Sequence, residues 1–189
     1  TLHLDGLATL SPDTAEALVG GCAKKWVGVL SQLDEIDPAT AKVLAEFEGP
    51  YLWLAGVVKI DADTGNALAD FKGDGLYLNS ISTIDMPIAK ALANVKAKGL
   101  ALNGLTRLDA DAATALAEFK GNWLDLNGLQ KINATTIKAI TGLEVEVLRL
   151  KGLTTIEADA AEALADLTAW DGQLPGLTTL DAEAAMKLA

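Results

Sequence analysis

The chain is poor in the residues that most catalytic and metal sites require. Its 189 residues include one histidine, His3, and one cysteine, Cys22. A single thiol excludes an internal disulfide framework, and a lone cysteine is usually a small buried hydrophobic residue, which we expect of Cys22. The sequence pattern brings no serine or cysteine near His3, so a catalytic triad is not supported. We therefore predict no enzyme activity, no metal site and no cofactor.

Positive charge is also scarce. Lys and Arg number 15 against 26 Asp and Glu, which leaves a net charge of -11. Nucleic acid is excluded as a partner, because binding phosphates requires clustered basic residues. No apolar run is long enough to span a bilayer, so we expect no membrane insertion. Half of the residues are hydrophobic, which predicts a single folded domain over residues 1–189 rather than a disordered chain.

What the chain has instead is an internal repeat. A Leu-x-Leu pair recurs, and from Leu30 onward its second leucine returns every 24 residues. The first interval is two residues longer, and we place the extra residues in a loop near 20–25. Apolar positions three and six residues further on keep the same register. The second leucines of the eight copies are Leu4, Leu30, Leu54, Leu78, Leu102, Leu126, Leu150 and Leu174.

Each copy predicts a strand, a turn and a helix. The alternating leucines share one face of a short strand, and the glycine that follows in most copies permits a turn or a close backbone approach. A capping residue then precedes an alanine-rich helix. Stacked copies can bury the apolar face that one copy cannot, so the strands should form a parallel sheet. The predicted caps are Ser11, Asp37, Asp61, Asp85, Asp109, Asn133 and Asp181, with Glu157 as a poor cap.

Two motifs with other meanings are interpreted as parts of this repeat. Residues 61–66 read DADTGN, which is similar to a calcium loop, but Lys72 stands where a bidentate Glu is needed. Asn133 opens an Asn-Ala-Thr glycosylation sequon, yet it also occupies the cap position. We interpret both motifs as helix N-termini.

The string LALNGLTRLDADAATALAEF at residues 100–119 resembles the bacterial leucine-rich-repeat proteins, in particular the surface-type class. The chain departs from that class by carrying Ala-x-Ala-Leu-Ala where the class has Ala-Phe. The resemblance covers the whole chain. It implies an α/β fold, namely a right-handed solenoid of eight strand-turn-helix repeats with a parallel sheet on the concave face. It also implies binding, usually of proteins, and an extracellular or cell-surface location.

The residues beside the leucines should point outward from the sheet and form the candidate binding face. Tyr51, Trp53 and Tyr77 are expected to meet on adjacent strands. Only 5% of the chain is aromatic, and exposed aromatic residues often anchor binding surfaces. The same residues can alternatively pack as ordinary cross-strand pairs.

A row of asparagines extends the candidate face. Asn79, Asn103 and Asn127 should stack on successive copies. The row would either contact a polar ligand such as a sugar or hold the copies together by bonds among the side-chain amides and to strand ends. A neighbouring group of mixed charge, expected to be a solvated rim, comprises Asp125, Arg149 and Lys151.

Two functions from different classes follow. The first is a non-enzymatic module that binds a protein or glycan ligand on its strand face. The second is a structural protein that assembles end to end into a filament or surface layer. No distinct cap precedes the first copy, so a homo-oligomer could form through an open N-terminal edge, whereas Pro175 is expected to blunt the edge of the last strand.

Overall fold

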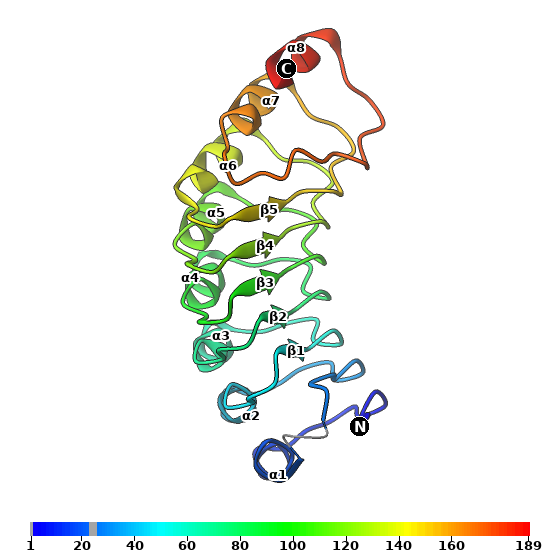
Figure 1. The fold of residues 1–189 in the computed structure, drawn as a ribbon, viewed down its shortest axis with the longest axis vertical. Helices are drawn as coiled ribbons and strands as arrows, with labels where there is room; N and C mark the ends of the chain where they lie inside the picture. The colour runs from blue at the N-terminus through cyan, green and yellow to red at the C-terminus, as the bar shows by residue number, and fades with distance from the viewer. Residues whose placement is uncertain (1, 23–25) are drawn as a thin grey trace.

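The computed structural model describes residues 2–22 and 26–189, and it has an α/β fold in which short parallel strands alternate with helices (Figure 1). The strands pair in chain order, and each residue lies opposite the one 24 positions further along, as Tyr51 does with Gly75. The period of the sequence is therefore the register of the sheet. The strands are β1 (Tyr51–Trp53), β2 (Gly75–Tyr77), β3 (Gly99–Ala101), β4 (Trp123–Asp125) and β5 (Val147–Arg149).

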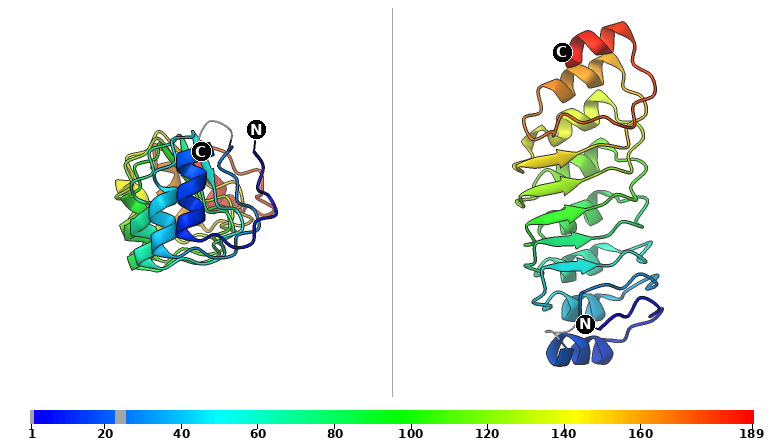
Figure 2. Two further views of the ribbon diagram at one scale, coloured as in Figure 1. Left: turned by 90° about the horizontal axis from the view of Figure 1, so that it is seen from below. Right: turned by 45° about the vertical axis from the view of Figure 1, so that its right-hand side comes forward.

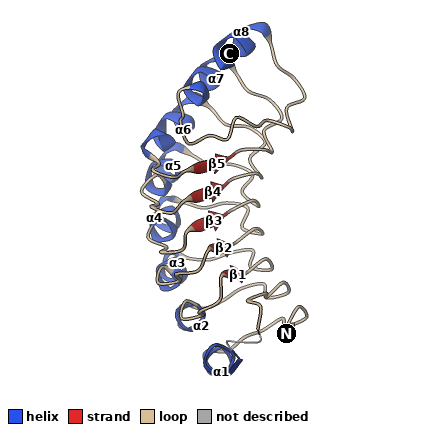
Figure 3. Cartoon of the chain, viewed as in Figure 1, coloured by secondary structure: helices blue, strands red, loops and turns tan. Residues whose placement is uncertain are grey.

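The helices stack beside the strands along one edge of an elongated molecule, with the two termini at opposite ends (Figures 1 and 3). The right-hand view of Figure 2 shows the strands one above another in a single layer. Among the described residues, no helix is long and apolar enough to cross a membrane. The helices are α1 (Pro12–Cys22), α2 (Pro38–Leu44), α3 (Ala62–Leu68), α4 (Met86–Ala93), α5 (Ala110–Leu116), α6 (Ala134–Ala139), the 3-10 helix η1 (Ile140–Gly142), α7 (Ala158–Ala165) and α8 (Ala182–Leu188).

The predicted capping residues begin the helices. In α5 the Asp109 carboxylate accepts a hydrogen bond of 2.8 Å from the backbone N–H of Ala112. Glu157 makes no side-chain cap bond at α7, so the prediction of a poor cap there is confirmed. The other predicted caps each accept a bond from the N–H three residues later: Ser11, Asp37, Asp61, Asp85, Asn133 and Asp181.

The core lies between the sheet and the helices. In the central copy, four large side chains are fully buried: Leu100 of β3, Leu102 just after it, Leu116 of α5 and Phe119 just after that helix. Burying a side chain of this size stabilises a fold by about 1.5–3 kcal/mol. Repetition of this set from copy to copy makes one continuous core along the stack.

The glycine after each Leu-x-Leu pair permits a close backbone approach, as predicted. A Cβ added at Gly128 would strike the carbonyl oxygen of Asn103 in the preceding copy. Where Ser80 replaces the glycine, its hydroxyl instead donates a hydrogen bond to the carbonyl of Ala55. The same contact with the preceding copy occurs at Gly56, Gly104, Gly152 and Gly176.

The first copies differ from the prediction of regular repeats. Strands were expected in every copy, but in the first two the described chain has only single bridges, such as Leu2 with Trp26. Residues 20–22 belong to α1 rather than to a loop, because this helix runs for 11 residues. Residues 23–25 and the side chain of Cys22 lie outside the described part, so its predicted burial is untested.

The last copy also leaves the register at its strand position, although Thr155 and Thr179 further along still pair 24 residues apart. Leu148 of β5 bridges to Trp170 rather than to Gly172, the residue 24 positions later. Gly172 has a φ of +72°, which breaks the extended backbone that a strand requires. Trp170 supplies the large side chain that Gly172 lacks. Pro175 is exposed and lies outside any strand, so its predicted place in an edge strand is wrong.

Replacing Asp109 with alanine should lower the free energy of unfolding by about 1 kcal/mol, because the first turn of α5 loses its capping oxygen. Urea denaturation followed by far-UV circular dichroism measures the change. Glu157→Ala is the matched control, since it removes an acidic residue from the same position of α7, where no side-chain bond forms. Equal losses in the two variants would mean that the charge, and not the hydrogen bond, stabilises the helix.

Candidate binding surface

Tyr51, Trp53 and Tyr77 meet on the outer face of β1 and β2, which confirms their predicted juxtaposition. The parallel register of β1 and β2 places Trp53 directly opposite Tyr77. Their rings are stacked, with centroids 3.6 Å apart and planes 3° from parallel. Tyr51 meets the edge of Tyr77 at a centroid distance of 6.1 Å. The three side chains form one packed group on the sheet.

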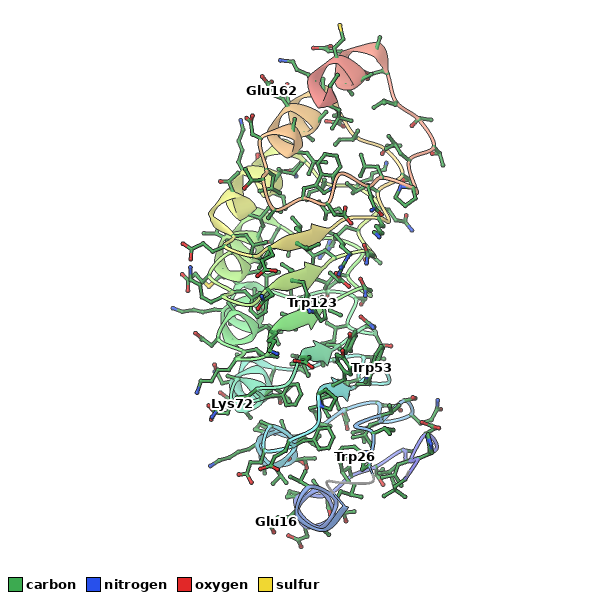
Figure 4. All side chains as sticks on the ribbon, viewed as in Figure 1. Glu16, Trp26, Trp53, Lys72, Trp123 and Glu162 are labelled. Atoms are coloured by element: carbon green, nitrogen blue, oxygen red, sulfur yellow. The ribbon has the colours of Figure 1, made fainter. Side chains whose placement is uncertain are left out.

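Trp123 of β4 joins this group, which the sequence pattern alone does not predict. Its ring centroid lies 5.7 Å from that of Tyr77. The indole covers Gly99 and reaches Gly75, because a Cβ at either glycine would collide with it. We call Tyr51, Trp53, Tyr77 and Trp123 the aromatic cluster, and its two tryptophans are labelled in Figure 4. Two glycines preceding a tryptophan at the same position of successive copies are the sequence feature that could have revealed it.

The aromatic cluster is both packed and accessible. Tyr51 is 41% exposed, and the other three side chains are half-buried. Packing of each ring against the next restricts its rotation, so little side-chain entropy remains to be lost when a partner binds. The cluster therefore combines apolar area still open to solvent with a fixed geometry.

A half-buried ion pair lies next to the cluster. Arg149 donates to Asp125 at 2.7 Å, and the two side chains are 34% and 15% exposed. From the sequence, a solvated rim is expected here. That expectation is wrong for Asp125, because pairing between adjacent strands and the surrounding side chains shield it. A more exposed pair joins Lys98 and Asp74, which directly precede β3 and β2, at 2.7 Å.

These neighbours also alter the titration of the cluster. Burial, followed by the nearby Tyr51 and Asp125, raises the pKa of Tyr77 above its ordinary value, while Arg149 opposes the shift. The hydrogen bond to Asp74 raises the pKa of Lys98. At neutral pH the Tyr77 phenol is therefore a protonated hydrogen-bond donor.

The asparagine row is bonded to the backbone of the next copy. The side-chain oxygen of Asn79 accepts from the N–H of Asn103 at 3.2 Å, and that of Asn103 accepts from Asn127 at 3.0 Å. Asn127 accepts in turn from Lys151 at 2.9 Å. The oxygens thus hold the copies together, as one of the two interpretations expected, although the bonds run to backbone rather than between amides. Contact of the amide nitrogens with a ligand stays a prediction.

Other parts of the surface show less organised chemistry. One hollow is lined by Phe47, Asp70 and Lys72, among others, and a second by Thr9, Asp34 and neighbouring residues. Neither is lined by a residue of the aromatic cluster, although Gly49 and Gly73 of the first lie two residues before β1 and β2. Within residues 2–22 and 26–189, no group of three or more His, Cys, Asp or Glu side chains is arranged to hold a metal ion.

Comparisons of the chain with protein-family models, with curated proteins and with solved structures give no match.

Gly99→Ala should displace the Trp123 ring, because the added methyl group would occupy the space of the indole. We expect a loss of stability of about 1–3 kcal/mol. The near-UV circular dichroism of the cluster should change while the far-UV spectrum stays the same. Gly142→Ala is the control, since nothing lies within 4 Å of the added carbon there. An unaltered near-UV spectrum would contradict the described position of Trp123.

Tyr77 should make stability fall at alkaline pH. Its pKa is raised in the folded state above the ordinary 10.0, so its contribution is complete below pH 10 and is lost as pH rises through the folded pKa. Urea midpoints between about pH 9 and about pH 12 should therefore fall more steeply in the parent than in Tyr77→Phe. Parallel curves for the two proteins would refute the raised pKa.

Proposed function

We propose that the chain is a leucine-rich-repeat solenoid of the bacterial surface type that serves as a non-enzymatic binding module. In this proposal eight repeats coil with a right hand, and the strand face is the concave one. The match between the 24-residue period and the sheet register supports it. The capped helix that follows each strand supports it as well.

The aromatic cluster is the observation that carries the binding function. Both tyrosines and two of the four tryptophans of the chain lie in it. A random distribution over the surface would not bring them together on three strands. Tryptophan and tyrosine are the residues that most often supply binding energy at interfaces.

Stabilisation of the sheet alone is a weaker explanation of the cluster. Cross-strand aromatic pairs contribute only about 0.2–1 kcal/mol each. Tyr51 remains 41% exposed, so folding leaves much of the apolar area of the cluster in water. A ligand that covers this area would gain the burial that the fold does not use.

End-to-end assembly is the second candidate function. Leu2, Leu4 and Leu7 of the first copy are only partly buried against the core. A second molecule stacked on this copy would cover them, as neighbouring copies cover the equivalent leucines elsewhere. Light scattering over a wide concentration range tests this candidate, and a strictly monomeric protein would rule it out.

Trp53→Ala and Tyr77→Ala should each weaken ligand binding by at least about 30-fold, because each removes an anchor of the cluster. The probes are a random peptide library and a panel of neutral hexasaccharides, and tryptophan fluorescence measures binding. Met86→Ala is the control, since Met86 is 49% exposed and lies on α4. Far-UV circular dichroism should be unchanged in all three variants. Binding that survives both cluster substitutions would place the site elsewhere.

A further inference from the structure

The rings of the aromatic cluster have two orientations. Trp53 and Tyr77 are nearly parallel at 3.6 Å, a separation close to ring contact, so their common normal runs from strand to strand. Both rings therefore stand upright on the sheet and present edges to solvent. One face of Tyr77 is covered by Trp53, and the other is turned toward the side of Trp123.

Trp123 instead lies over the sheet. A Cβ built on Gly99 would be closer to Cε2 of the indole than to any other ring atom. It would be equally far from Cδ2 and Cζ2, the two ring carbons bonded to Cε2, so it would lie directly above Cε2. The line from this Cβ position to Cε2 is therefore close to the normal of the indole plane. One face of the ring covers the glycine, and the half-buried side chain exposes its other side. Trp123 forms a sloping platform at 47° to the Tyr77 ring.

Ion pairs border the aromatic cluster. Lys98 is joined to Asp74 and Arg149 to Asp125, each at 2.7 Å. The molecule carries a net charge of -11, and acidic residues without such partners are concentrated at the helix N-termini, as Asp63 and Asp111 are. The surface around the platform is thus made largely of neutral ion pairs, with one further negative charge at Glu146, which accepts a hydrogen bond from Asn122 beside Trp123. A neutral partner matches it better than a cationic one, which the acidic surfaces elsewhere would attract.

Polar groups border the platform on the same strand. Asp125 lies two residues after Trp123 and so faces the same side of the sheet. The ion pair uses one guanidinium nitrogen and one carboxylate oxygen, and a guanidinium carries five N–H donors. The remaining donors and acceptors, with the Tyr77 hydroxyl, can meet adjacent hydroxyl groups of a ligand.

We propose that the Trp123 platform, walled by Tyr77 and bordered by the Asp125–Arg149 pair, binds a neutral carbohydrate chain. The C–H face of a sugar ring would lie on the indole, and its hydroxyl edge would meet the ion pair. This inference rests on the proposed binding function and assigns it a ligand class. A pyranose combines a flat apolar face with hydroxyl edges, and it carries no charge to unbalance the paired residues.

Isothermal titration with neutral gluco- and chito-hexasaccharides tests the proposal on the whole chain. At least one sugar should bind, and Trp123→Ala should weaken it at least tenfold, while Trp123→Phe, which keeps an aromatic face, should lose less. Arg149→Lys should also weaken binding, because it removes the planar donors. Met86→Ala should bind as the parent does. Raising the salt from about 50 to about 500 mM should change the affinity less than threefold, because the ligand is neutral.

Three results would overturn the proposal, and they separate it from the broader function. If a library peptide binds through Trp53 and Tyr77 while no sugar binds, the ligand class is wrong and the binding function stands. If neither class of probe binds, both proposals fail. If a sugar binds equally well to Trp123→Ala, whose far-UV spectrum confirms that it is folded, the platform is not its site.

Discussion

The whole structure depends on one constraint, which is that each copy must place its backbone against the preceding copy in parallel register. The strand hydrogen bonds hold this register on one side of the coil, and the asparagine oxygens extend it past the strand ends, as in the bond from Asn127 N–H to Asn103. Gly128 keeps the two backbones in contact where a side chain would separate them. The leucine core follows from this spacing, because only copies in register bring equivalent side chains together.

The same constraint produces the candidate binding surface. Register sets equivalent outward residues side by side, so Trp53 meets Tyr77. It also opens space wherever an equivalent position is glycine, and Trp123 fills the space above Gly99. Ion pairs across the strands obey the same rule. The arrangement of aromatic and charged groups is therefore a consequence of which residue each copy carries at one position.

Much of the fold could be predicted from the sequence, because the 24-residue period is visible along the chain and the buried leucines and the helix caps can each be recognised from residues within one copy. Asp109 caps α5 through atoms only three residues apart. Features that depend on neighbouring copies were harder to foresee. The position of the Trp123 ring depends on the lack of side chains at Gly75 and Gly99. The pairing of Leu148 with Trp170 instead of Gly172 depends on the positive φ of Gly172. Such effects join residues that are distant in sequence and follow no repeating pattern.

Consecutive helices contact one another along the stack, and the helix contacts found in the described chain are those between neighbours. Stability in such an array is a sum of terms for each copy and each junction, so unfolding need not be all-or-none. A weakened junction can open while the copies on either side stay folded. The aromatic cluster spans β1 to β4, and a bound ligand would bridge the junctions between those copies. Binding would then raise the cooperativity of unfolding as well as its midpoint.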